Sequence, residues 1–170
     1  MEFSSQIDAN KFHGGIKTDE IDLKILRILR ENSRESLAVI AENVGTSKAT
    51  VSRRITKMEQ NGFISGYTLT TNSIKLGLMR AMLSIELSGT SLDQVIEELG
   101  KFEEVHSLYK VFGDHNLLCE IYAQSVDLLY ELIQNKILKI PGIHNVEVDI
   151  YIEKIMLNSD AELDILSKKH

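Results

Sequence analysis

Hydroxyl and basic side chains are concentrated within residues 47–57, in the first half of the sequence. Lysine and arginine neutralise phosphates, serine and threonine hydroxyls bond to phosphate oxygens or base edges, and arginine can hold guanine through two hydrogen bonds. This combination is typical of a surface that binds double-stranded DNA. The candidate DNA-binding side chains are Ser47, Lys48, Thr50, Ser52, Arg53, Arg54 and Lys57.

A second polar group lies in the other half of the sequence, where a carboxylate, an imidazole and an amide follow a glycine. On these residues alone two interpretations stay open. One is a hairpin loop whose polar groups are satisfied locally, and the other is a site for a polar ligand. The group consists of Gly113, Asp114, His115 and Asn116.

Residues for other kinds of chemistry are missing from the sequence. The single cysteine, Cys119, excludes an intrachain disulfide and any metal site built from several cysteines. The histidines form no HxH or HExxH pattern, and there is no Walker loop, GxGxxG or GxSxG motif. We therefore expect no catalytic residue, no metal site and no cofactor, so the protein is not expected to be an enzyme.

Length and composition are those of an ordinary globular chain. The 170 residues allow one medium domain or two small ones, and 43% hydrophobic with 26% charged residues is enough to form a core. Apolar runs are short, and residues 1–17 have no hydrophobic segment of the kind found in secretory signals. We expect a cytoplasmic protein without a membrane partner.

The net charge of -6 argues against a nucleic-acid partner only until it is divided along the chain. Residues 1–66 carry ten Lys and Arg against nine Asp and Glu, whereas residues 67–170 carry nine against sixteen. Residues 47–61 contain four basic side chains and only one acidic side chain, Glu59. The acidity thus belongs to the second half, which suggests two modules with different partners.

The first half must form short helices to present the basic side chains. Apolar spacing predicts one helix over residues 19–32, a second that begins after Ser36 and ends at Gly45, and a third capped by Ser47 that ends before residue 61. Only two or three residues separate the second and third helices, which is a helix-turn-helix. In that motif the third helix here would enter the major groove.

The third helix has an apolar stripe that leaves the basic residues outside. Val51, Ile55 and Met58 recur at helical spacing and are expected to be buried. A three-helix scaffold without a DNA role is the alternative, and the positive excess on this one helix argues against it. Residues 63–69 are expected to add a short strand that leads out of a winged-helix-like module.

The second half alternates between strand and helix patterns. Its order, βαββαβ, with right-handed crossovers produces one antiparallel sheet with both helices on a single face, a ferredoxin-like sandwich. The fold class is therefore α+β. The predicted elements are a strand from residue 79 to 87, a helix over 92–102, a hairpin over 105–112 and 117–123, a helix over 126–140 that ends at Pro141, and a strand over 146–153.

The other face of this sheet is expected to carry apolar residues mixed with charged ones. In an isolated unit this surface would be exposed to solvent, and pairing two sheets face to face would bury it. The sequence therefore predicts a homodimer. The apolar residues expected on this open face are Met82, Leu108, Phe112, Leu118, Tyr122 and Tyr151.

Stretches in both halves follow the pattern of one known family. In the first half they are Asp19–Asp22 with Ile25, Leu26 and Leu29, then Ala41–Gly45, Ser47–Ile55 and Asn61–Ile64. In the second half they are Gly113–Leu118 and Pro141–Ile143. From residue 18 to about 157 the chain resembles the Lrp/AsnC (leucine-responsive regulatory protein, feast/famine) family of transcriptional regulators.

The resemblance implies a helix-turn-helix that binds palindromic or AT-rich operators. It also implies a second domain that dimerises, stacks dimers into higher oligomers such as an octamer, and binds an amino-acid effector between dimers. It places Gly113, Asp114 and Asn116 at the effector, and with His115 they are the candidate effector site. The family commonly has an aromatic residue at His115 and an aspartate at Asn116, so Asp114 is left to meet the effector's amino group.

These inferences combine into a sequence-specific DNA-binding transcriptional regulator whose assembly or DNA affinity responds to an amino acid. The alternative is a small-molecule sensor or enzyme subunit that does not bind DNA and uses the βαββαβ domain for ligand-controlled assembly. The expected organisation is a flexible N-terminal tail (1–17), a helix-turn-helix domain (18–66), a linker (67–77), a βαββαβ domain (78–157) and a C-terminal tail (158–170).

Overall fold

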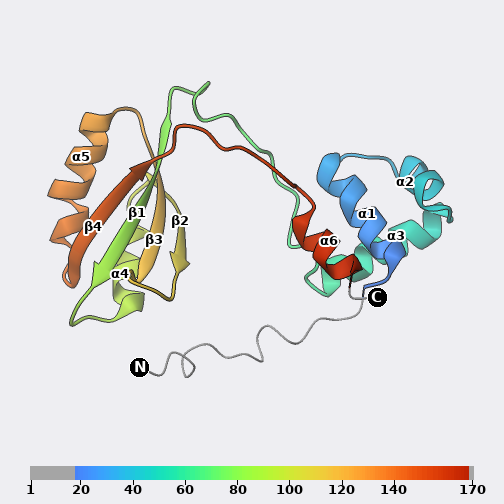
Figure 1. The fold of residues 1–170 in the computed structure, drawn as a ribbon, viewed down its shortest axis with the longest axis horizontal. Coiled ribbons are helices and arrows are strands. Elements are labelled where there is room, and N and C mark those ends of the chain that lie inside the picture. Colours follow the sequence, from blue (N-terminus) through green and yellow to red (C-terminus); the bar gives the residue numbers. More distant parts are fainter. Residues whose placement is uncertain (1–17, 169–170) are drawn as a thin grey trace. The chain divides into compact units, whose positions relative to one another are not determined.

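The structure is a computed structural model that describes residues 18–168. The chain divides into two compact units (Figure 1). The first, here called the helical unit, combines residues up to Leu69 with those from Met156 onwards, and the second, the sheet unit, is Thr70–Ile155. The N-terminal tail expected over residues 1–17 lies outside the described residues. Among the described residues, no helix has the length and apolar character needed to cross a bilayer.

The helical unit contains the three helices that the sequence predicts. They are α1 (Glu20–Glu31), α2 (Leu37–Val44) and α3 (Lys48–Gln60). Apolar positions at helical spacing form the core between them, as expected for helices too short to be stable alone. Its buried residues are Ile25, Ile40, Ala41, Val51 and Met58.

Polar side chains fix where these helices begin and end. Asp19 and Asp22 form a capping box at the start of α1, and Ser36 accepts a hydrogen bond from the backbone N–H of Val39 at the start of α2. Gly45 ends α2 in the left-handed region, with φ of 71°. The sharp turn between α2 and α3 therefore depends on a residue type that the sequence specifies.

The short strand expected over residues 63–69 is absent, so that prediction is wrong. Within the described residues this segment has no strand assignment, although the backbone N–H groups of Phe63 and Ile64 both donate to the carbonyl of Met58. A strand exists only when its backbone groups pair with a neighbour, and the helical unit contains no second strand among its described residues.

The C-terminal segment also differs from the expected tail over residues 158–170. It contains a sixth α-helix, α6 (Ala161–Ser167), which packs against α1 within the helical unit. Its Leu163 is buried, with 4% of its surface exposed. The sequence did not predict this helix because its seven residues are too few to give a convincing helical period.

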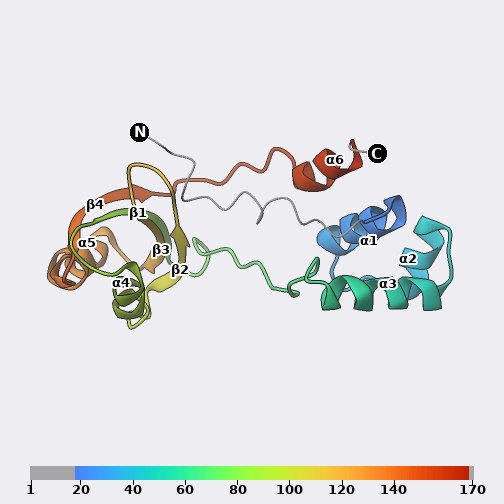
Figure 2. The same ribbon diagram turned by 90° about the horizontal axis from the view of Figure 1, so that it is seen from below.

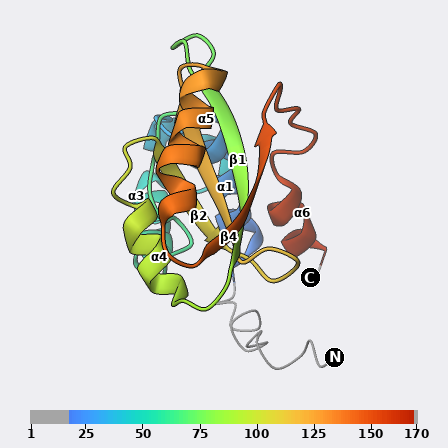
Figure 3. The ribbon, with the colours of Figure 1, turned by 90° about the vertical axis from the view of Figure 1, so that its left-hand side faces the viewer.

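The sheet unit has the expected βαββαβ order, and the α+β fold class is confirmed. The sheet is antiparallel, with strand order β2-β3-β1-β4, and both helices cover the same face of it (Figures 2 and 3). The elements are β1 (Met79–Leu87), α4 (Leu92–Leu99), β2 (Val105–Lys110), β3 (Leu117–Ala123), α5 (Val126–Asn135) and β4 (Ile143–Ile150).

The core of the sheet unit lies between one face of the sheet and the two helices. Leu83 of β1, Cys119 of β3 and Leu99 of α4 are fully buried there. Helix α5 ends earlier than predicted, at Asn135, and a 3-10 turn over Ile137–Lys139 continues the apolar face. Pro141 disfavours a helical conformation in the residue before it, and Ile140 is accordingly extended, which ends the 3-10 turn.

The opposite, open face of the sheet differs from the prediction at Leu108, and Phe112 lies beyond the end of β2, where no strand register assigns it to a face. Leu108 pairs with the buried Cys119 and packs against the core, so it faces the helices and not the open face. The register of β2 shifts between Val105 and Ser107, which the simple alternation of side chains did not anticipate. Ser107 and Tyr109 lie on the open face instead.

Candidate nucleic-acid interface and effector turn

Helix α3 separates an apolar side from a polar side. Val51 is fully buried and Met58 is 3% exposed, so these two residues define the side that packs on the core. The opposite side is exposed, and among the described residues its basic groups make no ion pair. The exposed candidates on this outer side are Lys48, Ser52, Arg53 and Lys57.

Arg54 lies at the edge of the packed side of α3, next to Arg53 and Lys57 around the helix, and it is less exposed than they are. One nitrogen, Nη1, donates to Asp19 Oδ2 at 2.7 Å and to Asp22 Oδ1 at 2.8 Å, and 25% of the side chain is exposed. The same two carboxylates accept the backbone N–H groups of the α1 capping box. Arg54 therefore ties α3 to the start of α1. Its position three residues after Val51 and four before Met58 is the sequence signal that could have found this role.

The contact shifts the pKa of Asp19 and that of Arg54, each in the direction that favours the charged form. Partial burial raises the pKa of the Asp19 carboxyl, but the hydrogen bonds from the Asp22 backbone and the Arg54 guanidinium outweigh it, so the pKa is lowered. Hydrogen bonds to Asp22 and Asp19 raise the pKa of Arg54. Both groups are therefore held in their charged forms.

Ser47 and Thr50 organise the start of α3. The Ser47 hydroxyl accepts a hydrogen bond from the Thr50 backbone N–H at 3.1 Å, and the two hydroxyl oxygens are 2.9 Å apart. Ser47 is thus the N-cap of α3, with Lys48 as the first helical residue. Because free N–H groups and the positive end of the helix dipole gather at this point, the start of α3 favours an anion such as a phosphate.

A hollow of about 780 Å³ lies beside α3, between it and the start of α1. Arg53 and Lys57 line it from α3. Arg54 and three carboxylates line it as well, so acidic and basic groups balance and the hollow has no excess of positive charge to attract a phosphate. These carboxylates belong to Asp19, Glu20 and Asp22.

In the sheet unit, the predicted effector residues form the turn between β2 and β3. Asn116 is committed to the fold, because its Oδ1 accepts the Leu87 N–H at 2.6 Å and its own N–H donates to the Ile85 carbonyl at 3.0 Å. Asp114 is exposed. Gly113 has no positive φ, and a Cβ built on it meets no atom within 4 Å.

Two carboxylates that were not among the predicted site residues face this turn. His115 Nδ1 lies 3.8 Å from Glu86 Oε1, and His115 Nε2 lies 3.7 Å from Glu147 Oε2. Glu86 and Glu147 come from β1 and β4, far from the turn in sequence, so only the strand register brings them to it. Among the described residues no set of three His, Cys, Asp or Glu side chains is arranged to hold a metal ion.

The open face of the sheet carries a row of polar contacts across its strands. Arg80 of β1 pairs with the buried carboxylate of Glu120, which also accepts a hydrogen bond from the Ser107 hydroxyl at 3.0 Å. The Arg80 guanidinium carbon lies 5.0 Å from the ring centre of Tyr151. On the helix-covered face, burial raises the pKa of the Cys119 thiol to about 12, so it stays protonated.

Comparison with protein families matches both units. Residues 18–65 match a family described as winged helix-turn-helix DNA-binding, and residues 80–160 match the Lrp/AsnC ligand binding domain. One curated relative, the HTH-type transcriptional regulator LrpA of Pyrococcus horikoshii, is 36% identical over 138 residues. That alignment covers 81% of this chain and 98% of the relative.

Solved structures with the same fold include two regulators. AsnC of E. coli superposes with a TM-score of 0.76 at 26% identity, covering 85% of this chain and 98% of AsnC. A transcriptional regulator of Neisseria meningitidis, solved as a complex with L-Met, has a TM-score of 0.77 at 19% identity. It is covered over 95% of its length, and this chain over 84%, so the likeness in fold spans both units.

Proposed function

This chain belongs to the Lrp/AsnC family of DNA-binding transcriptional regulators, and we propose that an amino acid bound at the Gly113–Asn116 turn controls how its copies assemble on an operator. The observation that carries the DNA-binding half of the proposal is the polar side of α3. It combines a capped helix start with exposed basic residues that have no ion-pair partner among the described residues. Regulation, and not catalysis, is the activity of the chain's relatives.

The proposed DNA contacts divide by role. Lys48, Arg53 and Lys57 supply charge to phosphates and base edges from the outer side of α3. Ser47, Thr50 and Ser52 supply hydroxyls at its first turns, where a recognition helix meets base edges. Arg54, in contrast, fixes the angle of α3 through its two carboxylate partners and acts on DNA binding indirectly.

The experiment for this half is selection of bound duplexes from a random-sequence library by the full-length protein. We expect enrichment of one motif with two related half-sites, because a symmetric dimer reads a symmetric operator. Binding to the enriched duplex should weaken steeply as salt rises. A protein that enriches no motif and binds all duplexes equally would contradict the proposal.

The effector half of the proposal is supported by the turn itself. Neither backbone conformation nor packing requires glycine at Gly113, so the absent side chain leaves room for a molecule from outside the chain. Asp114 is exposed beside it and supplies the carboxylate that an α-ammonium group needs. The Neisseria meningitidis relative in complex with L-Met gives methionine as one ligand to try first.

Calorimetric titration with each of the twenty amino acids tests the effector half. We expect one or a few to bind the full-length protein and to change its affinity for the selected duplex, since coupling between two sites is reciprocal. If no amino acid gives a signal, or if one binds without altering DNA affinity, the effector role is wrong and the DNA-binding role stands by itself.

We also propose that the protein is a homodimer, formed through the open faces of two sheets, and that dimers stack into larger assemblies up to an octamer. Mixed apolar and charged side chains on that face support the pairing. The buried Glu120 with its partners would fix the relative position of the two sheets. A regulator that acts on an operator works in the cytoplasm, where we place it.

A further inference from the structure

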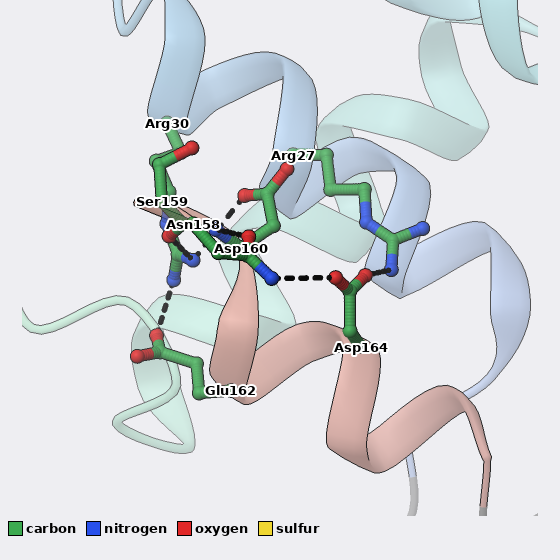
Figure 4. A network of polar contacts seen from close by, with 7 residues as sticks. All are labelled: Arg27, Arg30, Asn158, Ser159, Asp160, Glu162 and Asp164. Carbon is green, nitrogen blue, oxygen red and sulfur yellow. Dashed lines mark hydrogen bonds and ion pairs between the residues drawn. The ribbon is translucent and has the colours of Figure 1, made fainter. Parts of the chain in front are cut away.

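The C-terminal helix α6 is held to α1 by two arginines that lie one turn apart. Arg27 Nη2 donates to Asp164 Oδ1 at 2.6 Å, and Arg30 Nη1 donates to the Ser159 carbonyl at 2.6 Å (Figure 4). Arg30 also pairs with Asp160 Oδ1 at 3.3 Å and with Glu162. We call this group of ion pairs the α1–α6 clamp.

Asn158, in the segment before α6, makes hydrogen bonds to two of the acidic residues of the clamp. Asn158 accepts the Asp160 backbone N–H through Oδ1 at 2.9 Å and donates from Nδ2 to Asp164 Oδ2 at 3.1 Å. This Asx turn leads into the helix, and the second bond holds the Asp164 carboxylate that Arg27 meets. Leu163 of α6 is buried, and α6 packs against α1. Because charge pairs, backbone bonds and apolar burial act together, the attachment is stronger than isolated surface ion pairs.

The clamp changes how the two units are connected. The chain leaves the helical unit after Leu69 and returns to it at Met156, after β4 has ended at Ile150. Two covalent segments therefore join the units, and the second one ends at the clamp. A body held by one flexible segment samples many orientations, and a second covalent segment restricts their number.

The clamp lies at the edge of what this chain shares with the matched families. The ligand-binding-domain match ends at residue 160, and α6 begins at Ala161. The helix-turn-helix match covers α1 with both arginines; Arg30 finds Ser159 and Asp160 just before α6 and Glu162 within it, and Arg27 finds Asp164 within it. The returning segment therefore lies within the family match, and only α6 with Glu162 and Asp164 lies beyond it.

We infer that the α1–α6 clamp sets the spacing between the two half-sites that the protein accepts, and that Arg27 and Arg30 are positioning residues for this spacing. The inference rests on the proposed function, in which a dimer reads two half-sites. Binding of the second half-site gains from the first only when geometry allows both at once. Restricting the orientation of each helical unit favours one spacing and rejects others, whereas a released unit tolerates several.

The test uses full-length protein and the duplex that the wild type selects from a random library. Three probes are compared: one half-site, two half-sites at the selected spacing, and two half-sites with about half a helical turn, ~5 base pairs, inserted between them. The variant is Arg30→Glu, which reverses the charge facing Asp160 and Glu162. Lys24→Glu is the matched control, since Lys24 is exposed on α1 and makes no ion pair among the described residues.

We expect Arg30→Glu to bind the single half-site within about twofold of the control. Its affinity for two half-sites at the selected spacing should fall about tenfold. This is part of the ~10² to 10⁴-fold gain in affinity that binding two linked half-sites can give over binding one. The preference for the selected spacing over the altered one should shrink accordingly. The double variant Arg30→Glu with Glu162→Arg, which restores opposite charges, should recover the preference.

Other outcomes would overturn the inference. Equal losses on one and two half-sites would show that α6 only stabilises the helical unit, and an unchanged spacing preference would show that the second connection has no effect on DNA. If Arg30→Glu fails to fold, the double variant decides, because folded double-variant protein without spacing preference contradicts the inference. Failure of the proposed function is distinguishable, since the wild type would then select no duplex before any variant is made.

Discussion

Arg53 and Arg54 are neighbours in the sequence, yet they meet different surroundings in the structure. Arg53 is exposed on the outer side of α3, whereas Arg54 is bound by Asp19 and Asp22. The positive charge that α3 can offer to DNA is therefore smaller than the sequence count indicates. Adjacent helical positions point about 100° apart, so one residue of shift is enough to separate a DNA-binding side chain from a structural one.

Single substitutions of the two arginines should separate these roles. Arg53→Ala should leave the melting temperature unchanged and make the salt dependence of DNA binding shallower, by about 0.9 in the logarithmic slope for each phosphate that is no longer neutralised. Arg54→Ala should destabilise the protein by about 1 to 2 kcal/mol, because the Asp19 and Asp22 carboxylates lose the guanidinium that pairs with both. It should leave the salt dependence of DNA binding unchanged.

Thermal unfolding and binding titrations at several salt concentrations measure both effects. Lys139→Ala removes the same charge from an exposed position of the sheet unit and is the control for net charge. A shallower slope for Arg54→Ala, equal to that of Arg53→Ala, would place Arg54 on DNA after all.

The lowered pKa of Asp19 makes a second prediction for single residues. Its ordinary value is 3.8 and the folded value lies below it, so the carboxylate stabilises the fold above pH 3.8, and this contribution disappears as the pH falls through the folded value. Asp19→Asn keeps a capping side chain but loses the charge. Urea unfolding from pH 6 to pH 3 should show the variant less stable at pH 6 and the difference closing below pH 4. A constant difference would mean that the Asp19 charge contributes nothing.

At the scale of elements, turns and caps determine how the short helices and strands meet. Gly45 adopts a left-handed conformation that lets α2 and α3 cross after a tight turn. Gly113 has no such conformation although it lies in the turn between β2 and β3. The backbone therefore requires glycine at position 45, whereas at position 113 it does not, and there we propose that the lack of a side chain serves ligand binding.

Alanine substitutions at the two glycines should show this difference. Gly45→Ala forces a Cβ into the left-handed region and should destabilise the protein by about 1 to 2 kcal/mol. Gly113→Ala meets no atom within 4 Å and should change stability by less than about 0.5 kcal/mol. Urea unfolding measures both. The same Gly113→Ala protein should bind any effector found by calorimetry more weakly, and unchanged effector binding would remove Gly113 from the site.

For the whole molecule, the open face of the sheet is where we propose that two copies pair. Met82, Leu118 and Tyr122 lie on this face by their strand register, beside the ion pair of Arg80 and Glu120. Burying such a face against a second copy removes apolar surface from water and leaves the charged row to fix the register of the two copies. A dimer also supplies the two recognition helices that a symmetric operator needs.

A charge placed on the open face should therefore separate the copies. Met82→Lys puts an ammonium group beside the predicted contact and should shift the protein from dimer to monomer in light scattering coupled to size-exclusion chromatography. The control is Val126→Lys on α5, an exposed position at the start of a helix on the covered face, which should leave the mass unchanged. A wild-type protein that elutes as a monomer would contradict the prediction directly.

Local patterns in the sequence determined most of the secondary structure. Alternation over Met79–Leu87 and the capping signals at Ser36, Gly45 and Ser47 placed their elements correctly, because strand faces and helix ends depend on residues close in sequence. The family resemblance and the order βαββαβ then determined the fold class. Those features require no knowledge of distant contacts.

Tertiary structure decided what depends on residues far apart in the chain. Only the packing of α3 on α1 shows that Arg54 is bound to Asp19, only the register of β1 and β4 brings Glu86 and Glu147 to His115, and only the return of the chain shows that α6 binds α1. Each of these contacts joins residues separated by about 30 positions or more, whose pairing is set by the collapse of the whole core and not by local propensity. The sequence therefore specifies the elements and the class of chemistry that they carry, and the fold decides which charges remain available for DNA.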